Sequence, residues 1–491
     1  MPDYMFQLES RLSPEQRAAM VRIQELAAQF ESNLYLVGGA VRDMISGMSI
    51  RDLDFTIEGN PTKIIRELEK GGVKLVSEDD ALRCADLVMA GDVDASISAA
   101  REEVYARPGT KPDIRFSTIM EDLRRRDFSI NAIAISLNPN SRGLLLDPTN
   151  GLADLERREI RALTIHSFTN HPVRLLRALR YEARMGFKME QRTSDWFKLA
   201  IERQLQGTIS QEDAGGEFRQ VAREEKPGAV LKSWETHKLL GVVHPLLEKR
   251  HPDYEAINRI FKVREEMVSS GLRPRLFAPV TVAILGKLKD TERKSVLGRM
   301  GMPPSELRAV HDVEEEAAKN VKLLSGPKTA APRDTYAFLE KAPLESLAYI
   351  LAESSNAKAV GKIKTYFTKW KPLRQALPGV GLELELLGME RGPKFDKVLE
   401  DFFQLQLLGR ARKPEDHAKV LRKLSGIKEL FKKPEEKKKP EKGKKKGEPD
   451  AKPEAAPNGP VTPEKIQPHR MAQGKAAPAS KPKPKAKAKK K

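Results

Sequence analysis

The chain has 491 residues and a formal net charge of +19, from 88 Lys and Arg residues against 69 Asp and Glu residues. Residues 431–491 hold 20 basic and 7 acidic side chains, whereas the 430 residues before them hold 68 basic and 62 acidic ones. The excess charge therefore belongs to a C-terminal appendage on a nearly neutral body. At roughly 100–200 residues per domain, that body should contain about two to four domains.

The composition also excludes several classes of protein. A single cysteine, Cys84, rules out a disulfide framework within the chain and any zinc site of several cysteines, and it fits a reducing compartment. The longest apolar stretch, Phe277–Leu285, is far shorter than the roughly 20 residues needed to span a bilayer. Asp3 and Glu9 stand where a signal peptide would be apolar. We therefore expect a soluble, cytoplasmic protein with no membrane contact and no disulfide-linked partner.

The first part of the chain has an α/β pattern. The apolar run 34–37 stops at two glycines, and the alternating run 52–57 stops at Gly59. Further strand candidates and one helix candidate complete this part: 85–89, 93–99 and 131–137 as strands, and 62–70 as a helix.

The rest of the chain divides into a helical part and a low-complexity part. From about Gly151 helical periodicity dominates as far as Lys428. After Phe431 the chain is mostly Lys, Pro, Ala, Glu and Gly with almost no large apolar residue, so burial cannot offset the entropy of ordering it. We expect this C-terminal segment to be disordered.

Asp52 and Asp54 are the first candidates for chemistry. On a strand, residues i and i+2 point to the same face, so both carboxylates project together while Leu53 turns into the core. Paired carboxylates suit Mg²⁺ that is bound to a nucleoside triphosphate, and they repel each other without a cation. A solvated acidic strand face is the alternative.

Two further clusters are candidates for binding anions. Gly38 and Gly39 form a turn that can expose backbone N–H groups to phosphates, and Arg42 follows them. The segment 122–132 contains three consecutive arginines just before an apolar run, which indicates an anion or an acidic partner. A structural turn and a basic helix end are the respective alternatives.

The segment 173–185 is predicted to be a helix that begins after Pro172. At 100° per residue, its arginines fall within about 120° of one another and leucines cover the opposite face; these arginines are Arg174, Arg177, Arg180 and Arg184. Arginine is suited to bidentate phosphate contact and to reading base edges. Because the row contains no acid, a ligand is favoured over a solvated surface.

Together and in this order, these segments resemble the class II tRNA nucleotidyltransferase and bacterial poly(A) polymerase family. The resemblance is strong over residues 34–187 and fainter to about Leu424. It rests on five segments: Leu36–Asp43, Asp52–Gly59, Arg125–Ala132, Asp147–Leu155 and Pro172–Arg180.

The resemblance implies an α+β nucleotidyltransferase head with a mixed sheet, followed by all-α neck, body and tail domains. The boundaries expected are 1–150 for the catalytic head, 151–250 for a nucleotide- and RNA-binding neck, 251–430 for a tRNA-binding body and tail, and 431–491 for the disordered segment.

The resemblance also implies roles for residues. Asp52 and Asp54 would bind two Mg²⁺ ions that promote attack of the RNA 3′-hydroxyl on the α-phosphate of CTP or ATP. The remaining site residues would bind the nucleotide: Gly38, Gly39 and Arg42 at the triphosphate, Arg125, Arg126, Asp127 and Asn131 near the ribose, and His171, Arg174, Arg177 and Arg180 at the base and phosphates.

Three positions depart from the family pattern. Family members usually have Glu-Asp before the arginine helix, and that Asp accepts a hydrogen bond from the exocyclic amine of C or A. Here Asn170 and His171 stand at the two positions; an unprotonated ring nitrogen of His171 could still accept that hydrogen bond. A third acid of the family matches Ser96, with Asp94 two residues earlier on the same face. Asp213 stands at a usual Arg position in the neck.

The interpretation we favour is an enzyme that adds C and A residues to the 3′ end of tRNA without a template. Alternatives with the same chemistry are a poly(A) polymerase and a split CC-adding or A-adding enzyme. A non-catalytic RNA-binding protein on the same fold is a further alternative, and the retained Asp52 and Asp54 argue against it.

Overall fold

The computed structural model describes residues 3–106, 112–411 and 414–427. All of them belong to one compact unit, Met1–Lys428. The predicted disordered segment 431–491 lies outside the described residues. Within them, no helix is long and apolar enough to cross a membrane.

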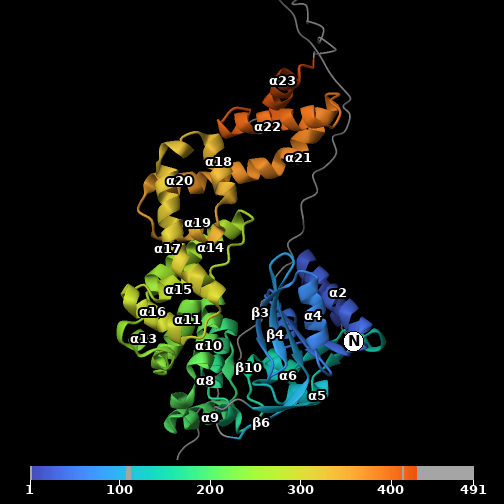
Figure 1. Cartoon of the computed structure of the whole chain (residues 1–491), viewed down its shortest axis with the longest axis vertical. Coiled ribbons are helices and arrows are strands. Elements are labelled where there is room, and N and C mark those ends of the chain that lie inside the picture. The colour runs from blue at the N-terminus through green and yellow to red at the C-terminus, as the bar shows by residue number, and fades with distance from the viewer. Residues whose placement is uncertain (1–2, 107–111, 412–413, 428–491) are drawn as a thin grey trace, which may run out of the picture. The chain divides into compact units, whose positions relative to one another are not determined.

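The N-terminal part is built on a mixed seven-stranded sheet (Figure 1). Neighbouring strands are antiparallel except β2 and β5, which run parallel. In spatial order the strands are β3 (Lys74–Asp79), β4 (Cys84–Met89), β5 (Val93–Ala99), β2 (Leu53–Ile57), β1 (Leu34–Val37), β8 (Ala134–Ser136) and β9 (Leu145–Leu146).

The two faces of this sheet differ in polarity. Along β2, Leu53, Phe55 and Ile57 are fully buried in the main apolar core. The alternate positions Asp54 and Thr56 lie on the opposite face, because successive strand residues point to opposite sides. Parallel pairing places Asp54 beside Ser96 and Thr56 beside Ser98 of β5. One face therefore forms the core and the other carries a polar site.

Helices and a small sheet complete the head, and a second small sheet follows it. In Figure 1 α2 and α4 lie beside the strands, and residues of α2 share the apolar core with the sheet. The helices are α1 (Tyr4–Arg11), α2 (Pro14–Gln29), α3 (Gly39–Ile45), α4 (Thr62–Lys70) and α5 (Ile119–Arg124), with 3-10 turns at Ser129–Asn131 and Pro139–Ser141. The small sheets pair β6 (Arg101–Val104) with β7 (Asp113–Phe116), and β10 (Glu159–Ile160) with β11 (Lys188–Met189).

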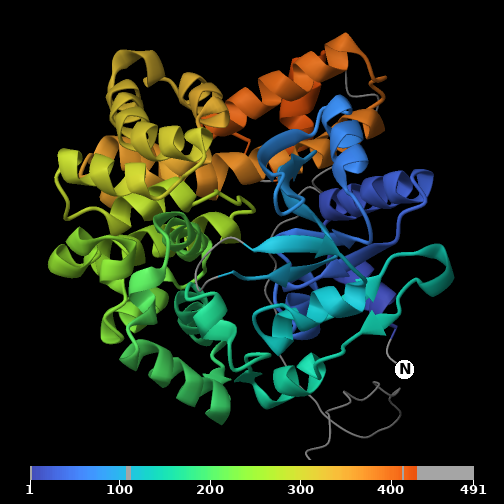
Figure 2. The same cartoon turned by 60° about the horizontal axis from the view of Figure 1, so that its bottom comes forward.

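The chain after residue 150 is almost entirely helical, and Figure 2 shows it in green to orange. Its first helices are α6 (Gly151–Arg157), α7 (Ser167–Asn170), α8 (Arg174–Met185), α9 (Gln191–Glu202), α10 (Gln211–Arg223), α11 (Pro227–Thr236), α12 (Leu240–Val243) and α13 (Pro245–Arg250). The later ones are α14 (Tyr254–Ser269), α15 (Phe277–Ile284), α16 (Asp290–Arg299), α17 (Pro304–Ser325), α18 (Pro332–Lys341), α19 (Leu344–Glu353), α20 (Ala357–Thr365), α21 (Lys371–Leu386), α22 (Pro393–Leu407) and α23 (Pro414–Ser425). Short 3-10 turns lie at Leu205–Thr208 and Pro327–Thr329, and one π-helical turn at Tyr366–Trp370.

Helix α8 shows why this sequence forms this element. Leu175, Leu176 and Leu179 are fully buried along one face. The helix ends at Gly186, whose φ of +67° is a left-handed conformation that glycine adopts without steric cost. Buried Trp234 of α11 donates its indole N–H to the carbonyl oxygen of Leu176 at 3.0 Å, which joins the two helices. The apolar face therefore holds α8 in place while its arginines point elsewhere.

The expected fold class, an α+β head followed by a helical region, is confirmed. The segment 131–137 is a partial exception, because it begins in a 3-10 turn and only Ala134–Ser136 form a strand. The domain boundaries stay a prediction.

Candidate active site

Asp52 and Asp54 meet at the glycine turn that follows β1. A methyl group added at Gly39 would lie 3.5 Å from Oδ2 of Asp54 and 3.8 Å from Oδ1 of Asp52, so both carboxylates border the same point. Gly38 has a φ of +64°, which L side chains rarely adopt, and a Cβ there would lie 3.2 Å from Nη1 of Arg126. The glycines thus leave open the space between the carboxylates and a guanidinium.

The environment of Asp54 is electrostatically unfavourable for a carboxylate. Burial and the charge of Asp52 raise the pKa of Asp54 to about 6, although Ser96 and Arg126 act in the opposite direction. Ser96 donates its hydroxyl to Oδ1 of Asp54 at 2.8 Å. The pair therefore carries negative charge that the surrounding groups only partly balance.

These carboxylates fit a divalent ion that is also held by a ligand. Hard cations such as Mg²⁺ take carboxylate oxygens and complete their shell with water and substrate phosphates. In the described part of the chain, no three His, Cys, Asp or Glu side chains are arranged to hold a metal. Asp94, the candidate for a third carboxylate, lies on the same strand as Ser96, and its Oδ1 is 3.8 Å from Nη2 of Arg275. Two carboxylates suit an ion whose remaining ligands are water and substrate phosphates.

The arginines just before the 3-10 turn are held by Asp122, whose side chain is fully buried on α5. Arg126 donates to Oδ2 of Asp122 from Nε at 3.1 Å and from Nη2 at 2.9 Å. Arg125 binds Oδ1 of Asp122 and donates to Glu103 at 2.7 Å. The three consecutive arginines indicated an anion or an acidic partner. Asp122 is that acidic partner, and it fixes the guanidiniums of Arg125 and Arg126 beside the sheet.

A ring of buried and partly buried polar groups joins the head to α8 and α10. Its links run from Arg42 to Asn131 (2.6 Å), Asn131 to Asp127 (3.0 Å), Asp127 to Arg177 (2.9 Å), Arg177 to Glu217 (2.6 Å), Glu217 to Arg180 (2.9 Å), Arg180 to Glu224 (2.9 Å), Glu224 to Arg184 (3.7 Å), Arg184 to Asp43, and Asp43 back to Arg42 (2.8 Å). Burial raises the pKa of Asp127, but Arg177 and Arg174 outweigh it and hold that pKa below its usual range.

The arginine row of α8 is therefore not uniform. Arg180 is only 4% exposed and sits between two carboxylates, Glu217 and Glu224. Arg174, at the start of the helix, donates instead to Oγ of Ser167 at 2.9 Å and to the carbonyl oxygen of Arg125 at 3.3 Å. Among the described residues, no carboxylate forms an ion pair with Arg174. Arg174 is thus the member of the row whose charge is least compensated.

His171 lies three residues before Arg174, at the end of α7. Its Nε2 contacts the hydroxyl of Tyr105 and lies 3.7 Å from Oε2 of Glu103. The two rings meet edge to face, with their centroids 4.6 Å apart. Asn170 is the last residue of α7, and its backbone N–H donates to the carbonyl oxygen of His166 at 2.8 Å.

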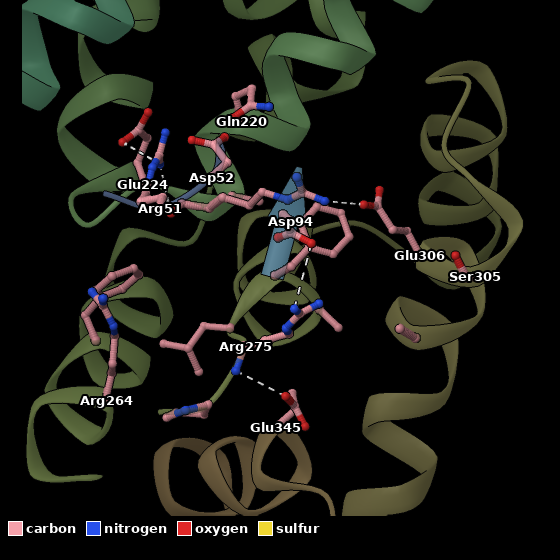
Figure 3. A pocket seen from close by; sticks show the side chains of 18 of the residues that line it. Arg51, Asp52, Asp94, Gln220, Glu224, Arg264, Arg275, Ser305, Glu306 and Glu345 are labelled. Atoms are coloured by element: carbon pink, nitrogen blue, oxygen red, sulfur yellow. Dashed lines mark hydrogen bonds and ion pairs between the residues drawn. The ribbon is translucent and has the colours of Figure 1, made fainter. Parts of the chain in front are cut away.

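A cavity of about 560 Å³ opens beside Asp52 (Figure 3). Arg51, Asp52 and Asp94 border it from the head, and Arg223 and Phe277 border it from the helical part. The guanidinium of Arg223 lies 5.6 Å from the centre of the Phe277 ring. Arg223 is also ion-paired with Glu306, which lines the same cavity, so the wall next to Asp52 carries an aromatic ring and paired charges.

Some of these groups were not singled out from the sequence. Asp122 could have been found, because it stands three and four residues before Arg125 and Arg126 on a helical segment. Glu217 and Glu224 could not, since only the tertiary fold brings α10 against α8. The hydrogen bond from Ser96 to Asp54 depends on the parallel register of two strands and leaves no local signal.

Comparison with known proteins places the chain in a family. The model of the poly A polymerase head domain matches residues 34–161. An A-adding tRNA nucleotidyltransferase from Halalkalibacterium halodurans is 32% identical over 77% of this chain and 85% of that protein. The chain belongs to the class II tRNA nucleotidyltransferase family. The expected family resemblance is thereby confirmed.

Relatives of this chain within the tRNA nucleotidyltransferase family differ in the nucleotides that they add. A CC-adding tRNA nucleotidyltransferase from Deinococcus radiodurans is 37% identical over 36% of this chain, which spans about half (48%) of that protein. The solved structure of the Thermotoga maritima CCA-adding enzyme complexed with tRNA is 25% identical, with 87% of this chain and 98% of that chain covered and a TM-score of 0.43.

Proposed function

We propose that this chain transfers a nucleotide from a nucleoside triphosphate to the 3′ end of tRNA without a template, and that the nucleotide it adds is A. The observation that carries the proposal is the incompletely balanced pair Asp52 and Asp54, which faces the glycine turn and of which Asp52 borders an open cavity. Such a pair is costly to the fold unless a ligand supplies positive charge.

In this proposal the RNA 3′-hydroxyl attacks the α-phosphorus, a P–O bond to the RNA forms, and pyrophosphate leaves. Mg²⁺ held by Asp52 and Asp54 would polarise the reacting oxygens and offset the charge of the triphosphate. Ser96 orients Asp54 through its hydroxyl. The glycines admit the triphosphate close to the backbone, and Arg126, held by Asp122, faces that space.

The nucleotide would lie between the head and the start of α8. Arg125, Asp127 and Asn131 border this region near the ribose, and Arg174, which forms no direct ion pair with a described carboxylate, supplies positive charge at its end. Arg42, Arg177 and Arg180 belong to the polar ring. Their main role would be to keep the head and α8 in a fixed relative position around the nucleotide. His171 takes the position at which the base is read.

Addition of A is supported by the relative from Halalkalibacterium halodurans, which is A-adding and of which this chain covers 85%. Full CCA addition is the second candidate, because a histidine acceptor suits the amine of either C or A. The cavity beside Asp52 would receive the RNA end, since it opens next to the paired carboxylates and Phe277 brings an aromatic ring to its wall; Arg223, which is ion-paired with Glu306, would have to exchange that partner to bind a phosphate.

Three tRNA substrates test the assignment: transcripts that end before the first C, after CC, and after CCA, each with ATP or CTP alone. We expect ATP to extend the transcript ending in CC by one residue and CTP to extend none. Addition of C to the shorter transcript would replace this proposal by CC or CCA addition, and long A tracts on unrelated RNA would replace it by poly(A) synthesis. A wild-type protein that extends no transcript would support the non-catalytic alternative.

A further inference from the structure

The β6–β7 hairpin brings two side chains against His171. Tyr105, just after β6, places its hydroxyl in contact with both Nε2 of His171 and Oε2 of Glu103. The side chain of Glu103 is 7% exposed and that of His171 is 29% exposed. Three groups that can each accept a proton therefore share one small region, and the number of protons among them decides what His171 offers outward.

Glu103 is an acceptor only. Its Oε1 receives Nε of Arg101 at 3.0 Å and Nη1 of Arg125 at 2.7 Å. Burial raises its pKa, but the charge of Arg125 and the hydrogen bond from Tyr105 act in the opposite direction, and the pKa of Glu103 is held well below its usual range. The carboxylate is thus anionic at neutral pH, and Oε2 is the oxygen left to receive the Tyr105 hydroxyl.

The single hydroxyl proton of Tyr105 is therefore committed to Glu103. Burial and the Glu103 charge raise the pKa of Tyr105, so this proton is retained. An unprotonated Nε2 would set its lone pair against the tyrosine oxygen and against a carboxylate oxygen 3.7 Å away. Both contacts become attractive only if Nε2 carries hydrogen and donates it to the tyrosine oxygen.

We propose that Glu103 and Tyr105 hold His171 with hydrogen on Nε2, so that Nδ1 is the ring nitrogen that accepts a hydrogen bond from the exocyclic amine of the incoming base. No described residue hydrogen-bonds Nδ1. This inference rests on the proposed function for its ligand, whereas the tautomer itself does not. Tyr105 and Glu103 are positioning residues, and they let a histidine serve as an acceptor for the amine of A or C.

The tautomer is measured directly in the free protein. Nitrogen-15 labelling of the histidines, with the His171 signal assigned by its loss in His171→Asn, reports which ring nitrogen carries hydrogen at pH 8. We expect hydrogen on Nε2 and a lone pair on Nδ1. Hydrogen on Nδ1, an even mixture or an imidazolium would overturn the proposal, whether or not the protein is active.

Selectivity provides the second measurement. GTP presents an oxygen where ATP has its amine, so two acceptors would face each other at Nδ1. With Tyr105→Phe the ring loses its partner, and we expect the preference for ATP over GTP in kcat/KM to fall about tenfold, chiefly through a higher KM for ATP. A uniform loss of kcat with unchanged preference, or no change at all, would overturn the proposal.

Tyr254→Phe is the matched control. Tyr254 also donates its hydroxyl to a glutamate, Glu235, at 2.6 Å, but it lies on α14 away from His171. The control should keep the wild-type preference for ATP over GTP. A similar loss of preference in both variants would show a general effect of removing a tyrosine hydroxyl and would contradict a specific role for Tyr105.

Discussion

The carboxylates beside the glycine turn and the arginines at the far end of α8 are both clusters of like charge, but only one of them is compensated. Arg180 lies between Glu217 and Glu224. These two ion pairs replace the water that would hydrate an exposed guanidinium and so offset the free-energy cost of burying it. Asp54 has one hydroxyl donor and a neighbouring carboxylate, and its pKa rises to about 6. Residue type alone therefore does not identify a ligand site. What distinguishes the two clusters is how far neighbouring groups balance the charge of each side chain.

The largest expected effect is on the compensated cluster. Glu217→Ala leaves buried Arg180 and partly exposed Arg177 with one fewer carboxylate, so we expect the free energy of unfolding to fall by about 3–5 kcal/mol. Urea denaturation followed by tryptophan fluorescence measures it, because buried Trp234 packs on α8.

Glu121→Ala is the control for this measurement. Glu121 pairs with Arg124 at the surface, where both side chains are about half exposed, and such pairs contribute at most about 1 kcal/mol. Equal losses in the two variants would remove the distinction between a buried and an exposed ion pair.

Removing one charge from the carboxylate pair, Asp52 and Asp54, should change stability in the opposite direction. Because folding raises the pKa of Asp54 from its ordinary value of 3.8 to about 6, ionisation of Asp54 costs stability as pH rises through about 6. Without divalent ions, Asp54→Asn should therefore stabilise the protein at pH 7.5 by about 2 kcal/mol and change it little at pH 4. Melting temperatures at the two pH values test this, and a destabilised variant at pH 7.5 would contradict it.

Within the arginine row, Arg174 and Arg180 separate binding from stability. Arg174→Gln removes a charge that forms no direct ion pair with a described carboxylate, so we expect kcat/KM for the nucleotide to fall about 10–100-fold with little loss of stability. Steady-state kinetics and a melting curve on the same sample measure both. If stability fell as far as in Glu217→Ala, Arg174 would belong with the structural ion pairs.

The smallest effect concerns the acid limb of the pH profile. Ser96 lowers the pKa of Asp54 by donating a hydrogen bond to its charged form. Ser96→Ala should move the acid limb of kcat/KM upward by about half a unit, since one hydrogen bond contributes about 1 kcal/mol. A limb that stays in place would mean that Asp54 does not set it.

Much of this arrangement could be predicted locally. The segment Thr62–Lys70 is a helix as its pattern indicates, and α8 begins two residues after Pro172. The spacing of Asp52 and Asp54 indicated that they act together, because a two-residue period is a property of the strand itself.

The partners of these residues could not be predicted in the same way. Glu217 follows Arg180 by 37 residues, and a sequence window contains nothing that brings α10 onto α8. Strand β3 (Lys74–Asp79) was missed because it is an edge strand with mostly polar side chains and lacks an apolar alternation. Tertiary pairing, rather than local pattern, decided which arginines were available to a ligand.

The most direct test of the account is single-turnover incorporation of labelled ATP into a tRNA ending in CC, by wild type and by Asp54→Asn at pH 7.5 with Mg²⁺. We expect incorporation to fall by at least about 10³-fold in the variant, although the variant is at least as stable as wild type when divalent ions are absent. Unchanged incorporation by Asp54→Asn would contradict the central claim that the uncompensated carboxylates perform the transfer.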